Sequence, residues 1–129
     1  MNLETQQKHF LEITEQMKSI MFAKGNDYAN KDRLSNFKLA GNISGLTPEL
    51  NCLSLIATKV ARLGVLLNND KTPNNESIND SLLDLANYTV LLTMLLKDKE
   101  SKSILKDYPQ TQNQPLTYVP ILGKHNQTY

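Results

Sequence analysis

The fold is decided by residues 76–96, which read ESINDSLLDLANYTVLLTMLL. Apolar side chains recur around most of the circumference of a helix over this stretch, and such a helix is normally central and buried. Four polar residues, Glu76, Asp80, Asp84 and Asn87, follow at steps of four, four and three and therefore share one narrow stripe. Buried carboxylates need a metal, a basic partner or a ligand, because an uncompensated buried charge is very costly. That need is the strongest functional indication in the sequence.

Three further helices are predicted before this one. Residues 3–23 place apolar side chains on one face at helical spacing, and Gly25 fits the position just after a helix end. Residues 33–40 form a short helix between a capping Asp32 and Gly41. A long helix begins at Thr47-Pro48-Glu49 and runs to about Asn69.

The last helix opens near Asn75 or Ser77 and continues to Lys99 or beyond. Ser77 and Asp80 have the spacing of a capping box, in which each side chain bonds to the other residue's backbone N–H. The expected fold is therefore all-α, a small bundle of three long helices plus a short one. Because one helix is apolar on all faces, we expect oligomerisation to complete the bundle.

Pro109 separates a helical domain, residues 1–108, from an extended tail, residues 109–129. Pro115 and Pro120 exclude a helix around the apolar segment 116–122. Such an apolar segment is expected to dock, either on its own domain or on a neighbouring subunit.

Composition narrows the class of protein. With 129 residues the chain is one domain, and 14 Lys and Arg balance 13 Asp and Glu, so neither a generic nucleic-acid binder nor a specific duplex reader is indicated. The single cysteine, Cys52, excludes an intramolecular disulfide and a cysteine zinc cage, and His9 and His125 lie far apart in sequence. The polar start does not resemble a signal peptide, and the apolar stretches look too short and interrupted to cross a bilayer. We expect a cytoplasmic protein with no membrane association.

Two basic residues suggest the partner of the acidic stripe. Lys59 and Arg62 lie one turn apart at the margin of the apolar face of the helix that starts at Pro48. Such a pair calls for anions, which Asp80 and Asp84 or the phosphates of a ligand can supply. An ion-pair network between helices with no further role is the structural alternative.

The segment after the first helix combines a cation, a glycine, two amides, a carboxylate and an aromatic ring, from Lys24 to Asn30. Tyr28 could stack on a base, while Asn26 and Asp27 could bond to a base or sugar. An ordinary turn is the alternative. The full set of expected ligand-binding residues is Lys24, Asn26, Asp27, Tyr28, Arg33, Asn36, Lys59, Arg62, Asp80, Asp84, Asn87 and Tyr88.

Four motifs occur in order: KGNDYA (24–29), RLSNF (33–37), KVARL (59–63) and ESINDSLLDLANY (76–88). On these motifs, over residues 10 to 96, the chain resembles the phage and prophage family called nucleotide modification associated domain, type one. The resemblance implies a small all-α protein of a phage or prophage, acting on or binding nucleotides in the bacterial cytosol.

A more distant resemblance is to the all-α nucleotide pyrophosphohydrolases of the MazG and dimeric dUTPase group. That group implies Mg²⁺ held by acids on two helices, commonly in an oligomer. Glu76, Asp80 and Asp84 match the second acidic cluster and would be the catalytic and metal-binding residues of an enzyme. The first cluster is matched poorly, by Leu11-Glu12-Ile13-Thr14-Glu15, with Leu where the first Glu belongs.

Three functions therefore compete. The first is a nucleotide-binding protein without turnover, which needs no cofactor and could act as an anti-defence sponge for a host signal. The second is a Mg²⁺-dependent nucleoside triphosphate pyrophosphohydrolase of the dNTP pool. The third is a helical interaction module with a structural ion-pair core. The incomplete acidic set beside basic residues favours the first.

Overall fold

The computed structural model describes residues 1–28, 30–68 and 72–107, and these residues form four helices and no strand. They are α1 (Leu3–Tyr28), α2 (Ser35–Ser44), α3 (Pro48–Asn68) and α4 (Ile78–Asp107). The all-α prediction is confirmed. The predicted tail, residues 109–129, lies outside the described residues.

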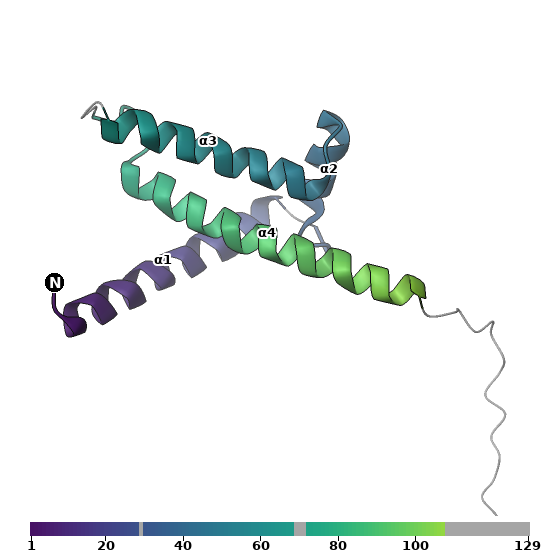
Figure 1. Cartoon of the computed structure of the whole chain (residues 1–129), viewed down its shortest axis with the longest axis horizontal. Coiled ribbons are helices and arrows are strands. Elements are labelled where there is room, and N and C mark those ends of the chain that lie inside the picture. Colours follow the sequence, from purple (N-terminus) through teal and green to yellow (C-terminus); the bar gives the residue numbers. More distant parts are fainter. Residues whose placement is uncertain (29, 69–71, 108–129) are drawn as a thin grey trace, which may run out of the picture.

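Helices α3 and α4 run alongside each other in opposite directions, while α1 crosses α4 and α2 lies at the N-terminal end of α3 (Figure 1). The core forms where α2, α3 and α4 meet, around Phe37, Cys52 and Leu95. Cys52 is fully buried, and its thiol donates to the backbone carbonyl of Tyr88 over 3.4 Å. This contact joins α3 to α4 directly after the last residue of the acidic stripe.

The two glycines predicted to end helices have other roles. The first helix does not stop at Gly25 but continues through Tyr28. The short helix spans Ser35–Ser44 instead of 33–40, and Gly45, at φ 72°, ends it in the left-handed conformation. Gly41 is buried inside this helix, where a Cβ would lie 2.6 Å from the carbonyl oxygen of Leu46. It allows the close approach of the α2–α3 turn, a tertiary requirement that a helix-end signal does not reveal.

The expectation that α4 is buried on all faces is wrong for the single chain. Leu82, Val90, Met94 and Leu96 are between 36% and 48% exposed. Buried positions on α4 include Ser81, Leu83, Asn87 and Leu95. Among the described helices, α1 and α3 are the ones that pack extensively along α4, so part of its apolar circumference is left uncovered by them.

The prediction that no stretch is long and apolar enough to cross a bilayer is also wrong. Helix α3, Pro48–Asn68, meets both criteria by length and composition. Core helices of soluble proteins can meet the same criteria. In the single chain, however, little of α3 is buried.

Candidate functional site

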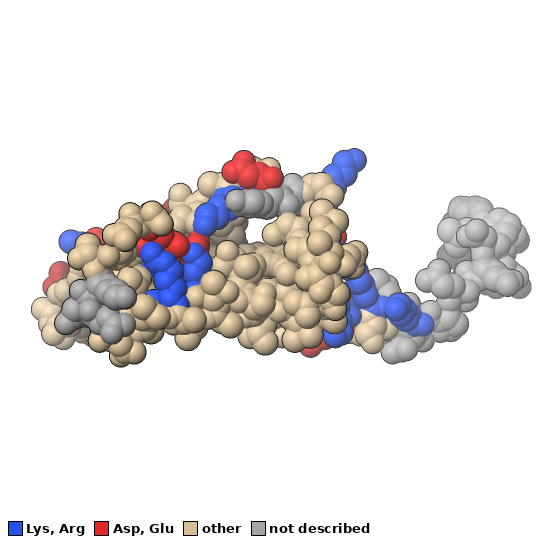
Figure 2. Space-filling model, turned by 90° about the horizontal axis from the view of Figure 1, so that it is seen from above, with Lys and Arg blue, Asp and Glu red and all other residues tan. Residues whose placement is uncertain are grey.

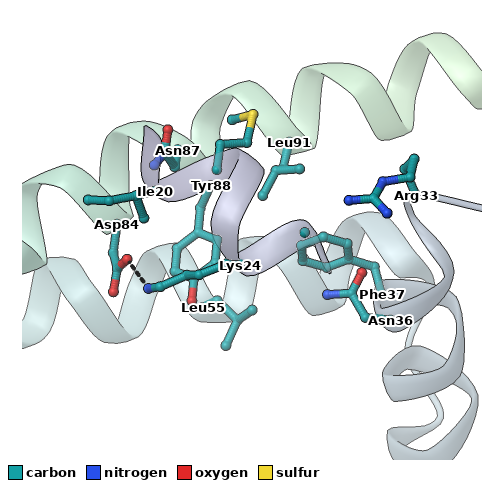
Figure 3. A pocket seen from close by; sticks show the side chains of 12 residues that line it. Ile20, Lys24, Arg33, Asn36, Phe37, Leu55, Asp84, Asn87, Tyr88 and Leu91 are labelled. Carbon is teal, nitrogen blue, oxygen red and sulfur yellow. Dashed lines mark hydrogen bonds and ion pairs between the residues drawn. The ribbon is translucent and has the colours of Figure 1, made fainter. Parts of the chain in front are cut away.

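A cavity of about 310 Å³ lies where the C-terminal half of α1, the start of α2 and the middle of α4 come together. Its polar lining consists of Lys24, Arg33, Asn36, Asp84, Asn87 and Tyr88. Its apolar lining includes Ile20, Met21, Phe37, Leu55 and Leu91. In Figure 3 the Asp84–Lys24 pair lies at one end and Arg33 at the other, with the rings of Tyr88 and Phe37 between them.

Asp84 joins three helices at its end of the cavity. One carboxylate oxygen accepts a hydrogen bond from Lys24 Nζ of α1 at 2.7 Å, and the other lies 2.8 Å from Lys59 Nζ of α3. Burial alone would raise the pKa of this carboxyl, but the hydrogen bonds from the two lysines outweigh burial and lower it. Asp84 is therefore a carboxylate at neutral pH, already compensated by the protein's own cations.

The two lysines stay charged for the same reason. The hydrogen bond to Asp84 is the main cause that raises the pKa of Lys24. Burial of Lys59 opposes its charge, yet the hydrogen bonds to Asp84 and Glu76 give a net rise in its pKa. The Lys24 side chain remains 53% exposed, whereas that of Lys59 is 16% exposed. Of the two, Lys24 is the ammonium group that an incoming anion can reach.

The other acids of the stripe have separate partners. Glu76, which precedes α4, accepts a hydrogen bond from Lys59 at 2.6 Å, and its backbone carbonyl accepts one from Arg62. Arg62 also donates to the buried hydroxyl of Ser81 over 2.8 Å. Lys59 and Arg62 thus pair mainly with Glu76 and Asp84, and neither forms an ion pair with the predicted Asp80.

Asp80 caps α4. Its carboxylate accepts hydrogen bonds from the backbone N–H and hydroxyl of Ser77, whose Oγ accepts from the Asp80 N–H at 3.0 Å. The predicted capping box is confirmed. With Glu76, Asp80 and Asp84 engaged in different contacts, the described residues contain no group of three or more His, Cys, Asp or Glu that could hold a metal.

Arg33 has no carboxylate partner among the described residues. It forms no hydrogen bond or ion pair with the described residues, although it lines the cavity. Its guanidinium group lies over Gly25, where a Cβ would come within 2.5 Å of Nη2. Gly25 therefore leaves room for the end of this side chain.

Asn87, which lines the cavity, links α4 to α1. It is 5% exposed, and its Nδ2 donates to the carbonyl of Met17 over 3.0 Å. Its Oδ1 is buried without a hydrogen-bond partner among the described residues. An open buried acceptor is uncommon and costs free energy until a donor satisfies it.

On the same helix, burial raises the pKa of the Tyr88 phenol, which therefore stays protonated.

Six of the twelve predicted ligand-binding residues line this cavity: Lys24, Arg33, Asn36, Asp84, Asn87 and Tyr88. Lys59 adjoins it through Asp84. Asn26 and Asp27 lie exposed in the last turn of α1, not in a loop, and the side chain of Tyr28 lies outside the described part of the chain.

Leu55, Leu91 and Ser81 were not predicted as site residues. Leu55 and Leu91 follow the ordinary spacing of core positions, so their sequence gives no signal for a cavity. Ser81 lies next to the stripe, but nothing in the sequence distinguishes its buried hydroxyl from an exposed one.

Comparison with known proteins adds no relative: no family model, no curated protein and no solved structure matches the chain.

Proposed function

We propose that this chain binds a phosphorylated nucleotide in the cavity between α1, α2 and α4 and holds it without turnover. The observation that carries the proposal is Arg33, whose guanidinium group has no hydrogen bond or ion pair among the described residues and faces a cavity that also contains a second cation, two amides and two aromatic rings. A volume of about 310 Å³ is at the lower end of typical small-molecule sites.

Arg33 and Lys24 would bind the phosphates. The fork of a guanidinium group matches two phosphate oxygens at once, whereas an ammonium acts as a point charge. Lys24 is shared with Asp84, so a phosphate would compete with, or add to, that contact. The polar lining carries two cations and one carboxylate, which favours an anionic ligand.

The rings and amides would bind the base or sugar. Tyr88 and Phe37 lie between the two cationic ends, where a flat ring can pack on aromatic carbon. Asn36 has both a donor and an acceptor for a base edge.

Binding without turnover is favoured over hydrolysis by the state of the acids. Asp84 and Glu76 are neutralised by Lys24, Lys59 and Arg62, and Asp80 is part of a helix cap. Glu12 and Glu15, the weak match to the first acidic cluster, are exposed and pair with residues of their own helix. Together with the resemblance to a phage nucleotide family, this supports a sponge that sequesters a nucleotide signal.

The fate of a bound ligand tests the proposal. Purified protein is incubated with nucleoside triphosphates and cyclic nucleotides, with and without Mg²⁺, freed of excess ligand and heat-denatured, and the released compound is identified by chromatography. We expect an intact nucleotide, retained in EDTA. A monophosphate formed only with Mg²⁺ would instead identify a pyrophosphohydrolase, and no retention across the panel would leave a structural module.

Two variants connect binding to this cavity. Arg33→Gln should weaken binding of the retained nucleotide by roughly 10- to 100-fold, which is the effect of losing a charged hydrogen bond. Lys31→Gln removes the same charge two residues away, outside the cavity lining, and should bind normally. Gly25→Ala should also weaken binding, because its Cβ displaces Arg33. Titration calorimetry with the retained nucleotide measures all three, and equal loss in Lys31→Gln would refute the assignment.

A further inference from the structure

Helix α3 carries a regular apolar stripe on the side away from α4. Its members are Leu50, Leu53, Ala57, Val60, Gly64 and Leu67, spaced three, four, three, four and three residues apart. This alternation is the pattern of a seam between two helices. The four large members are 48% to 62% exposed, so the described chain leaves about half of each side chain uncovered.

The same side of α3 carries no charge. Between Leu50 and Asn68 the charged residues are Lys59 and Arg62, and both bind acceptors in the segment from Glu76 to Asp84. Figure 2 looks down on the molecule from the side of α3 and shows a broad stretch of uncharged surface, with charged side chains gathered beside and beyond it. An apolar strip along a helix of this length is larger than isolated surface leucines explain.

Gly64 is unusual for the middle of a long helix. A Cβ there would meet nothing within 4 Å, so no contact inside the chain requires a glycine. Glycine in a helix interior is unfavourable relative to alanine. Its position within the apolar stripe indicates that a neighbouring molecule approaches α3 closely at this point.

We propose that the outward stripe of α3 is a homodimer interface in which α3 packs against α3 of a second copy, antiparallel. In this orientation Leu53 lies opposite Gly64, Val60 opposite Ala57 and Leu50 opposite Leu67 of the second copy. Each large side chain in the centre meets a small one, so the surface is complementary to itself, as a two-fold interface requires. A parallel pair would place Gly64 opposite Gly64 and leave a gap.

A second copy fits this surface better than lipid does. Lys59 and Arg62 lie in the middle of α3 with Glu76, Ser81 and Asp84 bound to them, so a bilayer would have to accommodate a charged network at its centre. Two identical uncharged faces can meet without charge repulsion. Neither argument involves the ligand cavity, so this interface stands independently of the proposed function.

Sedimentation analysis of the full chain tests the interface. We expect a particle of twice the 14.6 kDa chain mass. Leu53→Glu should shift it to the monomer mass, because two carboxylates would be buried per dimer. Thr58→Glu places the same charge on the same helix but off the stripe and should remain dimeric. A monomeric parent chain, or a dimer that Leu53→Glu leaves intact, would overturn the proposal.

A second variant covers the case in which Leu53→Glu fails to fold. Gly64→Leu has open space in the single chain but fills the gap that Leu53 of the second copy needs. It should keep the helical circular dichroism signal and sediment as a monomer. An unchanged Gly64→Leu dimer would refute the antiparallel register.

Oxidative cross-linking determines the orientation. Residues 50 and 67 are about 25 Å apart along the helix at 1.5 Å per residue. In an antiparallel dimer, Leu50→Cys and Leu67→Cys chains should cross-link when mixed and exchanged, but not separately. Cross-linking of each alone would indicate a parallel pair and overturn the orientation. Flotation of the parent chain with phosphatidylcholine vesicles is the remaining test. Recovery of the chain with the vesicles would assign the outward face of α3 to lipid instead of to a second copy.

Discussion

At the scale of single residues, Asp84 has the greatest influence on the site. It is the point at which Lys24 of α1 and Lys59 of α3 meet α4, and it forms one end of the cavity. Its low exposure strengthens both contacts relative to a surface ion pair. The same carboxylate therefore contributes to stability and sets the charge that an incoming phosphate encounters.

Replacing Asp84 should change how stability depends on pH. The pKa of Asp84 is lower in the folded chain than its ordinary 3.8, so its contribution is present above that value and is lost as the pH falls through the folded pKa. The raised pKa values of Lys24 and Lys59 give a contribution that is complete below 10.5 and is lost at higher pH. Asp84→Asn should reduce the free energy of unfolding by about 1–3 kcal/mol at pH 7, with a smaller deficit below pH 4.

Urea unfolding between pH 3 and pH 7 measures this effect. Asp27→Asn, which removes an exposed carboxylate at the end of α1, is the matched control and should unfold like the parent chain. If the deficit of Asp84→Asn is the same at pH 3 and pH 7, the ion pairs do not cause it.

At the scale of elements, the starts of the three long helices, α1, α3 and α4, are determined locally. The side chain of Asn2 accepts a hydrogen bond from the backbone N–H of Thr5 at 2.8 Å. The side chain of Thr47 accepts one from the backbone N–H of Leu50 at 3.2 Å. Ser77 and Asp80 cap α4 reciprocally. These bonds satisfy backbone donors that the helices leave open, and they need no tertiary partner.

Loss of the α4 cap should lower stability without affecting ligand binding. Ser77→Ala removes the acceptor for the Asp80 N–H and should cost about 1 kcal/mol in urea unfolding. Because Ser77 is not part of the cavity lining, calorimetric affinity for the retained nucleotide should not change. Weaker binding with unchanged stability would reassign Ser77 and Asp80 to the ligand site.

At the scale of the whole molecule, the described chain buries few large side chains. Its fully or nearly fully buried hydrophobic residues are Phe37, Cys52, Leu63, Leu83 and Leu95. Phe10 and Leu11 of α1, like the stripe on α3, are about half or more exposed. A core of this size gives a marginal fold, so burial between copies would contribute to the stability of each chain.

Thermal stability should therefore depend on protein concentration. For a dimer whose chains unfold as they separate, a 100-fold increase in concentration should raise Tm by several degrees. Scanning calorimetry from micromolar to hundreds of micromolar chain measures the shift, and Gly64→Leu is the monomeric comparison. A concentration-independent Tm in the parent chain would mean that folding does not rely on a second copy.

By itself, the sequence determined the helical class, the long helices and the capping box of α4, because these depend on spacing and on contacts within a few residues. It also identified Lys59 and Asp84 as charged residues that need a partner, because both lie beside apolar positions on their helices. These features follow from local geometry, which a linear pattern contains.

The tertiary structure alone decided which charges meet and what the glycines do. It paired Lys59 with Glu76 as well as with Asp84, and it brought Arg33 over Gly25 beside the cavity. It also placed Gly41 in a tight turn contact and Gly64 on an open face. The physical reason is that these contacts depend on how α1, α2 and α3 are oriented against α4, and helical periodicity sets the faces of each helix but not the angles at which helices cross.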